Sequence, residues 1–292
     1  MIKRIIAKIE KNKIYKFLME VYDELDQTHI FLISSGISFN ILLYILPLIL
    51  LIIYVITLFF DFELTINLIY NLINDFLPRN LNKKEMILKF ENEIKLLFEN
   101  STIFGFIGFS TLIFLSSALI SSIRYGLNLV YDIKEYRLGI IYKIKDILIT
   151  LLFTILILGY VFLMPLVNYI VDVINYITPL EMQGFISSIF FYIMSIIFEL
   201  VFYLFVYVII PSDKINYKLA TLSTLIAVIF MEAFRFLFSF YFANFNNYGK
   251  IYGSLNIVLG LALWLYYSSL IMMFAGMLAK VILRHRGIII KK

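Results

Sequence analysis

Three charged side chains stand inside long apolar stretches of the sequence, where a charge is costly. Glu199 lies near the middle of one stretch, and Glu232 and Arg235 lie in the next. Charged residues at such positions usually face the interior of a helical bundle or a wet cavity. Glu232 and Arg235 are three positions apart, which places them on one face of a helix. These three residues are therefore our candidates for substrate binding or proton coupling.

Two interpretations of this set stay open. In the structural one, an ion pair locks two helices together. In the functional one, the imbalance of two carboxylates against one guanidinium matters, because a glutamate without a cation favours its neutral, protonated form. At about 1.5 Å of rise per residue, Glu199 and Glu232 should lie within about a turn of each other in depth. A neutral carboxyl beside Arg235 could then couple proton exchange to the movement of an anion.

The composition points to a bilayer as the solvent of most of this chain. Of its 292 residues, 62% are hydrophobic and 15% are charged, whereas a soluble domain carries about 25% charged residues. Folding so much apolar surface in water would leave large exposed patches. There is no cysteine, and His29 and His285 lie near opposite ends. We therefore predict no metal centre, and the absence of known catalytic motifs predicts no cofactor, no catalytic residue and no enzyme.

Six apolar runs are long enough to cross the hydrocarbon core as helices, which takes about 20 residues each. They do not alternate as barrel strands would, so the predicted class is all-α, a polytopic membrane bundle of six transmembrane helices. The runs are Ile30–Phe60, Ile103–Ile123, Ile140–Ile170, Phe185–Ile210, Tyr217–Phe242 and Gly253–Leu283.

The basic residues predict the orientation of the bundle. Most of the 25 lysines and arginines fall in the segments before the first run, between the second and third, between the fourth and fifth, and at the end, with Arg124 and Lys280 counted among them. The positive-inside rule makes that side cytoplasmic. We expect a multi-pass protein of the bacterial cytoplasmic membrane with both termini inside, and no nucleic-acid partner, because the basic residues follow topology rather than a groove.

Two segments outside the runs show helical periodicity. Within the predicted cytoplasmic segment 1–29, residues 2–21 mix lysines with regularly spaced apolar side chains, which predicts an amphipathic helix on anionic lipids. Residues 61–102 show two further amphipathic repeats around Pro78, which predict an outer helical hairpin on the transmembrane domain 30–285. This hairpin is either a structural cap or a partner surface. Residues 286–292 form a basic tail, and a homo-oligomer stays open.

Several short patterns, taken in order, resemble the YihY/BrkB family of bacterial inner-membrane proteins, once labelled ribonuclease BN-like. The patterns are Ser34-Ser35-Gly36-Ile37-Ser38-Phe39 with Pro47, Leu127-Asn128 with Tyr131, Pro211-Ser212, Glu232-x-x-Arg235-x-x-Phe238-x-x-Tyr241, Tyr252-Gly253-Ser254-Leu255, and Leu263-Trp264-Leu265-Tyr266-x-Ser268. From these patterns we take five structural or gating candidates: Pro47, Asn128, Tyr241, Gly253 and Trp264. Pro47 should also kink its helix.

The resemblance implies six transmembrane helices and a transporter or an envelope-integrity factor without a settled substrate. One residue departs from the pattern: Met277 stands where the family usually has a glutamate. The ribonuclease label finds no metal cluster or basic groove in this sequence. Our leading hypothesis is a transporter or flippase for an anionic or lipid-like substrate. The alternative is a scaffold that does not transport and binds partners through residues 61–102.

Overall fold

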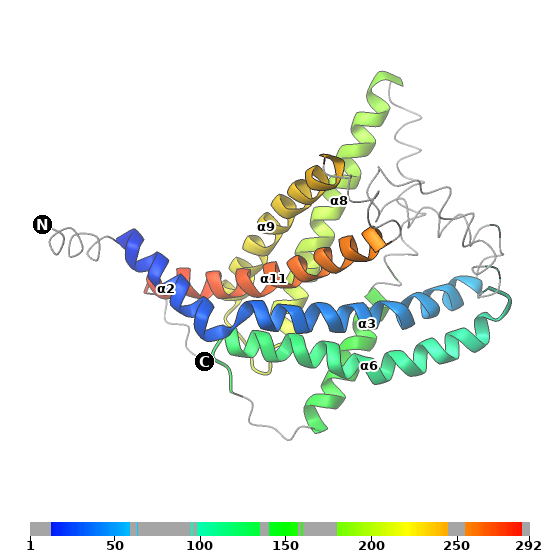
Figure 1. Cartoon of the computed structure of the whole chain (residues 1–292), viewed down its shortest axis with the longest axis horizontal. Coiled ribbons are helices and arrows are strands. Elements are labelled where there is room, and N and C mark those ends of the chain that lie inside the picture. The colour runs from blue at the N-terminus through cyan, green and yellow to red at the C-terminus, as the bar shows by residue number, and fades with distance from the viewer. Residues whose placement is uncertain are drawn as a thin grey trace, which may run out of the picture. The chain divides into compact units, whose positions relative to one another are not determined.

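The structure is a computed structural model, and it describes residues 13–58, 63, 95, 98–134, 140–156, 159, 180–244 and 255–287 (Figure 1). Every regular element in these residues is an α-helix, which confirms the all-α class. In chain order they are α2 (Lys13–Thr28), α3 (Ile30–Thr57), α6 (Ser101–Val130), the helical residues 140–156, α8 (Leu180–Ile209), α9 (Tyr217–Asn244) and α11 (Leu255–His285).

Within the described residues, four helical segments are long and apolar enough to cross a membrane. They are Ile30–Thr57, Ile189–Ile209, Tyr217–Tyr241 and Val258–His285, and Ser101–Leu112 is a shorter apolar segment. The count of six spans stays a prediction, because much of the third run lies outside the described residues. Residues 1–12, Gly253 and nearly all of the predicted hairpin at 61–102 also lie outside the described residues.

One predicted boundary is wrong. The second run was expected to end at residue 123, with Arg124 in the following loop, but α6 continues to Val130. The helix continues because the charge of Arg124 is neutralised inside the protein: its guanidinium pairs with Asp146 and stacks 4.7 Å from the ring centroid of Tyr142. In the sequence, a single arginine after an apolar run indicates the end of a helix. In the structure, Arg124 is part of a packed contact inside the helix.

The chain divides into two compact units. Unit 1 comprises residues 1–37, 120–231 and 266–292, and unit 2 comprises residues 38–119 and 232–265. The core of unit 1 includes the fully buried Tyr207, Leu127 and Met273. The Tyr207 hydroxyl donates a hydrogen bond to the carbonyl oxygen of Met272 at 2.7 Å, which satisfies the phenol inside an apolar core. Met277, the departure from the family pattern, is also fully buried there.

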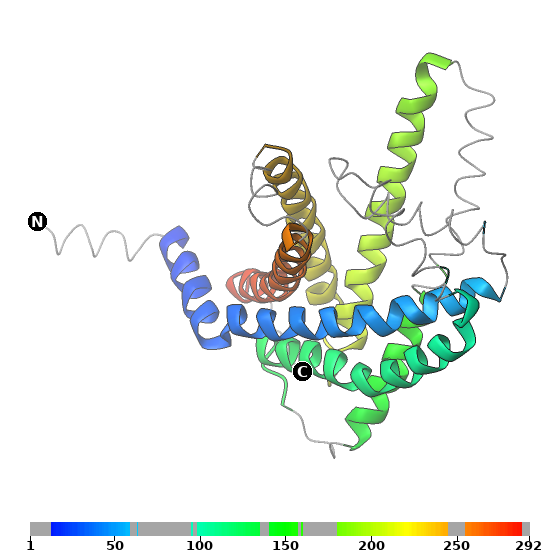
Figure 2. The same ribbon diagram turned by 45° about the vertical axis from the view of Figure 1, so that its right-hand side comes forward.

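Helices α3 and α6 pack closely in both units because α6 carries glycine at the contacts. In unit 1, a Cβ at Gly126 would lie 2.8 Å from Ile33 Cγ2. In unit 2, a Cβ at Gly108 would lie 2.9 Å from Leu50 Cβ and 3.0 Å from the carbonyl oxygen of Pro47. Small residues let backbones approach in this way in membrane helices. Figure 2 shows the two helices running together.

Helices α2 and α3 are separated by one residue, His29. This residue has a φ of 45°, in the left-handed region, which side chains other than glycine seldom adopt. Its amide donates to the Asp26 carbonyl, and its own carbonyl accepts from the amides of Leu32 and Ile33. His29 therefore ends one helix and begins the next, and the chain changes direction there (Figure 1).

Candidate functional site

The Glu232–Arg235 pair lies in the apolar part of α9. Arg235 Nη1 donates to Glu232 Oε1 at 2.7 Å, as expected for residues three apart on one helix. The Arg235 side chain is 35% exposed and that of Glu232 is 21% exposed, so the pair is only partly covered by protein. Because both partners belong to α9, this contact does not by itself tie α9 to another helix. The structural interpretation, in which an ion pair locks two helices together, therefore stays open.

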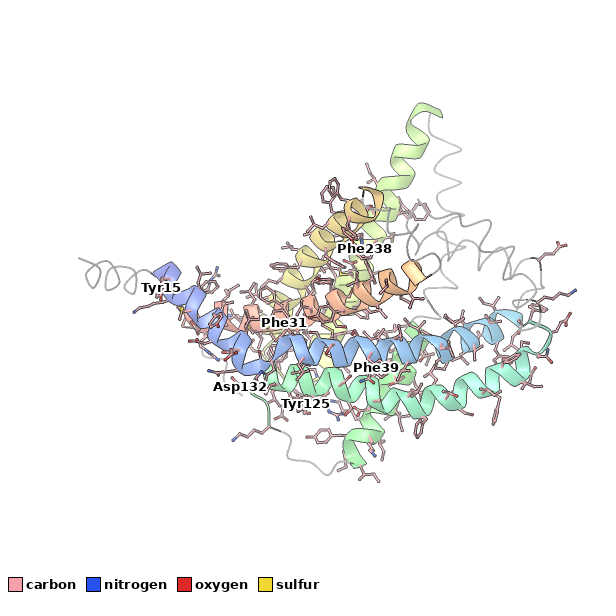
Figure 3. The ribbon with its side chains drawn as sticks, viewed as in Figure 1. Tyr15, Phe31, Phe39, Tyr125, Asp132 and Phe238 are labelled. Atoms are coloured by element: carbon pink, nitrogen blue, oxygen red, sulfur yellow. The ribbon has the colours of Figure 1, made fainter. Side chains whose placement is uncertain are left out.

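Aromatic side chains on the same segment pack around Trp264. The Trp264 ring lies 5.2 Å from the ring of Phe234 and 5.0 Å from the ring of Phe238, measured between centroids. These contacts join α9 to α11 inside unit 2, and Figure 3 labels Phe238 on α9. Trp264 thus packs between α9 and α11, and its assignment as a structural or gating residue stays a prediction. Tyr241, on the last turns of α9, is exposed.

Glu199 lies on α8 and is half-buried. It belongs to unit 1, whereas Glu232 and Arg235 belong to unit 2. The depth that we predicted it to share with Glu232 therefore stays a prediction. The described part of the chain holds no group of three histidine, aspartate or glutamate side chains that could hold a metal ion.

Asn128 connects the end of α6 to the turn between α8 and α9. Its Nδ2 donates to Ser212 Oγ at 2.7 Å, and its Oδ1 accepts from the Ser212 amide at 3.0 Å. Beside it, Lys145 Nζ donates to the carbonyl oxygen of Pro211 at 2.8 Å. Two of the sequence patterns, Leu127-Asn128 and Pro211-Ser212, therefore meet in space. Their role here is to hold a turn to a neighbouring helix.

Pro47 lies inside α3, which continues through it from Ile30 to Thr57. Proline has no amide hydrogen, so the carbonyl one turn earlier loses its usual partner. The Pro47 carbonyl faces the position of Gly108 on α6. The proline thus sits where α3 and α6 approach closely.

Sequence reasoning missed a buried ion pair between Arg124 of α6 and Asp146 in the helical residues 140–156. Both side chains are almost fully buried. Arg124 also donates to Ser121 Oγ at 3.2 Å, and its guanidinium lies over Tyr142. The two residues are 22 positions apart, with Arg124 expected in a loop and Asp146 in the run after it, so spacing alone gave no signal. A search for opposite charges at the ends of neighbouring runs could have found them.

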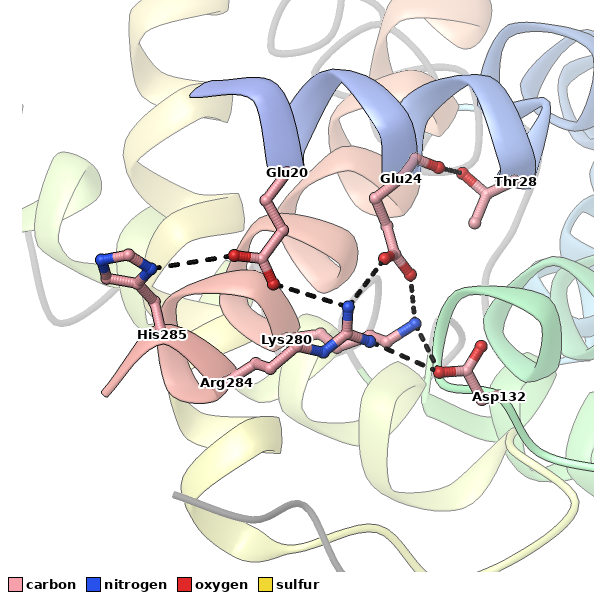
Figure 4. A network of polar contacts seen from close by, with 7 residues as sticks. All are labelled: Glu20, Glu24, Thr28, Asp132, Lys280, Arg284 and His285. Atoms are coloured by element: carbon pink, nitrogen blue, oxygen red, sulfur yellow. Dashed lines mark hydrogen bonds and ion pairs between the residues drawn. The ribbon is translucent and has the colours of Figure 1, made fainter. Parts of the chain in front are cut away.

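A second missed feature is a cluster that we call the ionic clasp, made of Glu20, Glu24, Asp132, Lys280, Arg284 and His285 (Figure 4). Lys280 Nζ contacts Glu24 and also Asp132 Oδ2, the latter at 2.7 Å. Arg284 Nη1 lies 3.1 Å from Glu24 Oε2 and 3.5 Å from Glu20 Oε1. Lys280, which the sequence analysis counts among the cytoplasmic charges, is buried in α11.

The ionic clasp joins three elements of unit 1. Glu20 and Glu24 come from α2, Lys280 and Arg284 come from α11, and Asp132 follows the end of α6. His285 Nδ1 lies 3.7 Å from Glu20 Oε2, and its ring packs edge-on against Phe17. Buried charges of this kind are tolerated when they are paired and hydrogen-bonded. The clasp therefore holds α2 against the end of α11.

Apolar helices of membrane-spanning length, paired through glycine and joined by buried ion pairs, define a polytopic helical membrane protein. Within that class, residues 21–288 match the family described as virulence factor BrkB, and the chain belongs to that family.

Three curated relatives, each named a UPF0761 membrane protein, show how far the similarity extends. The one from Psychromonas ingrahamii is 27% identical over 266 residues, covering 90% of this chain and 86% of the relative. The one from Glaesserella parasuis is 26% identical over 194 residues, 65% of each chain. The one from Idiomarina loihiensis is 30% identical over 93 residues, 32% of this chain and 33% of the relative. No solved structure matches.

Proposed function

We propose that this membrane protein is a transporter or flippase for an anionic or lipid-like substrate, with Arg235 as the group that binds the anion. The observation that carries the proposal is the partly exposed Glu232–Arg235 contact within α9. A guanidinium binds carboxylate and phosphate oxygens through paired hydrogen bonds. An incoming anion would replace Glu232 as the partner of Arg235.

A comparison with the other ion pairs of the chain supports this role. The Arg124–Asp146 and Lys280–Glu24 pairs each join separate elements, and their side chains are buried. They have the geometry of structural contacts. The Glu232–Arg235 pair instead stays within one helix and is more exposed. A charge in the middle of an apolar span is expensive unless it serves a structure or a pathway, and the greater exposure of this pair favours a pathway.

The proposed mechanism uses Glu232 as the resident counter-ion. When a substrate anion takes over the guanidinium of Arg235, the carboxylate loses its partner in an apolar setting, and taking up a proton then becomes favourable. Binding of the anion and protonation of Glu232 would thus be coupled. The proposal places the protein in the bacterial cytoplasmic membrane with both termini inside, following the distribution of its basic residues.

Lipid movement can be measured with the full chain in proteoliposomes. The probes are fluorescent phosphatidylglycerol and phosphatidylcholine carrying an NBD group, bleached from outside by dithionite. We expect the wild type to speed loss of the inner-leaflet signal for the anionic probe. Arg235→Gln and Glu232→Gln should abolish that gain, whereas Lys218→Gln, which removes an exposed charge at the start of the same helix, should not.

Two outcomes would overturn the proposal. If the wild type moves neither lipid faster than empty vesicles, lipid transport is wrong, and the scaffold function acting through residues 61–102 takes its place. If the variants lose folded protein and activity in equal measure, the pair is structural. Accessibility adds a second readout: the chain has no cysteine, so Ala233→Cys is the sole thiol, and its labelling by an impermeant reagent would report a water-filled path.

A further inference from the structure

Helix α2 turns two acidic residues inward and part of its apolar surface outward. Its acidic residues Glu20 and Glu24 face inward, toward Lys280 and Arg284 of the ionic clasp. Its apolar residues Leu18 and Tyr22 face outward, with 58% and 65% of their surface exposed. A surface helix in water normally turns its apolar face to the core. An apolar environment outside the protein would therefore stabilise the exposed face of α2.

The outward residues Leu18 and Tyr22 form a continuous stripe with the half-buried Leu25. Leu18, Tyr22 and Leu25 are spaced four and three positions apart, so they share a helix face. Two residues rotate a helix by about 200°, so Glu20 and Glu24 lie on the side opposite Leu18 and Tyr22. We call Leu18, Tyr22 and Leu25 the apolar stripe.

The apolar stripe lies next to the exposed, apolar start of the α3 span. Only His29 separates α2 from α3, whose apolar span begins at Ile30. The first turn of α3 exposes Phe31 and Leu32, and Figure 3 labels Phe31 there and Tyr15 on α2. A helix joined to a span by one residue stays close to the level where that span enters the bilayer. Tyrosine, with an apolar ring and a polar hydroxyl, is enriched at that level.

Charge does not explain attachment of α2 to a membrane. The helix carries two lysines, Lys13 and Lys16, against four acidic residues. The expected basic helix on anionic lipids was drawn largely from residues 1–12, which lie outside the described residues. For α2 itself, the attraction must come from its apolar side chains, which bind at the headgroup boundary in proportion to the apolar area that they bury.

We propose that α2 is an interfacial helix whose apolar stripe inserts into the lipid surface of the leaflet that α3 enters at Ile30. The ionic clasp holds the acidic face of α2 to α11 at the same time. The helix is thus fixed between lipid on one side and the last described span on the other. This role is independent of whether the protein transports a substrate.

Site-directed labelling can locate each face, because the chain has no native cysteine. Leu18→Cys and Tyr22→Cys report the apolar stripe, and Asp23→Cys and Gln27→Cys report the polar side of the same helix. Each full-length variant carries an NBD label and is reconstituted in phosphatidylcholine vesicles. Quenching is then measured with doxyl-labelled lipid and, separately, with aqueous iodide. A thermal melt of each labelled variant checks that the protein is folded.

We expect doxyl lipid, and not iodide, to quench the labels at positions 18 and 22, with the opposite pattern at 23 and 27. Adding phosphatidylglycerol should change neither pattern. Iodide quenching at all four positions would show that α2 lies in water and would overturn the proposal. The proposal would also fail if positions 18 and 22 are shielded from both quenchers and Leu18→Cys forms disulfides between copies. In that case a second chain covers the apolar stripe. A pattern that requires phosphatidylglycerol would assign the attachment to the lysines instead.

Discussion

Removing one member of the Lys280–Glu24 pair should destabilise the protein more than removing a less buried charge from the same cluster. The Lys280 side chain is 4% exposed and that of Glu24 is 10% exposed, so both belong to the buried regime. Breaking a buried pair by deleting one partner typically costs about 3–5 kcal/mol. Each residue keeps a second partner, since Lys280 also contacts Asp132 and Glu24 also contacts Arg284. We therefore expect Glu24→Gln to cost about 3 kcal/mol, the lower end of that range.

Glu20 provides the matched control. It lies one turn earlier on α2 and contacts Arg284 at 3.5 Å, where both side chains are more exposed. Exposed pairs contribute about 0–1 kcal/mol, so Glu20→Gln should change the free energy of unfolding by less than about 1 kcal/mol. Reversible unfolding in mixed detergent micelles, followed by circular dichroism, measures both variants under the same conditions.

A double-mutant cycle completes the test. Because Glu24 and Lys280 are in contact, their effects should not add, and Glu24→Gln combined with Lys280→Met should cost clearly less than the sum of the two single changes. Equal effects of Glu24→Gln and Glu20→Gln would refute the reasoning, because the clasp would then behave as a solvated surface. Additive single changes would show that the two side chains do not interact in the folded state.

Three further predictions concern unit 1 and the α3–α6 contact. Asp146→Asn leaves Arg124 buried without its counter-charge, so the free energy of unfolding should fall by about 3–5 kcal/mol in the same assay. Gly108→Leu should prevent close packing of α6 on α3 and lower the yield of folded protein in size-exclusion chromatography, whereas Gly36→Ala, where an added Cβ meets nothing within 4 Å, should not. Tyr131→Phe removes the 3.0 Å hydrogen bond to Ser223 and should cost about 1 kcal/mol at pH 8. Burial raises the pKa of Tyr131 above its ordinary value, so the folded state favours the neutral phenol. The free energy of unfolding of the wild type should thus exceed that of Tyr131→Phe by less and less as the pH rises past about 10. Unfolding measured at pH 8 and pH 11 tests this.

Each of these predictions has an outcome that would contradict it. A loss below about 1 kcal/mol for Asp146→Asn would mean that Arg124 reaches water. Normal yield of Gly108→Leu would mean that α3 and α6 do not pack closely at this point. If the difference in free energy of unfolding between wild type and Tyr131→Phe stays constant with pH, the Tyr131 phenol ionises as readily in the folded as in the unfolded state.

The helices could be predicted because their signal is local. The apolar runs are long enough to cross a bilayer, and they predicted that α3 starts at residue 30 and α9 at residue 217. The structure has both starts. Glu232 and Arg235 were predicted to share one helix face from their spacing of three, and their contact on α9 agrees with this.

The ion pairs between elements could not be predicted because they depend on contacts far apart in the sequence. Glu24 and Lys280 are 256 positions apart, and no periodicity connects them. Arg124 was misplaced for a related reason: a lone arginine in an apolar run reads as a boundary until its partner is known. Reading hydrophobic length alone therefore finds the helices but puts some buried charges in loops.

The separation of Glu24 from Lys280 along the chain has a consequence for biosynthesis. Translation produces α2 first, and Glu24 emerges long before the segment that contains Lys280 and Arg284. Until α11 has been made and inserted, the acidic residues of α2 lack their basic partners and the ionic clasp cannot form. The last described helix thus completes the fold of the first. A ribosome that stalls before α11 would leave a chain whose exposed α2 distinguishes it from the finished protein, and a membrane protease could use that difference to select incomplete chains.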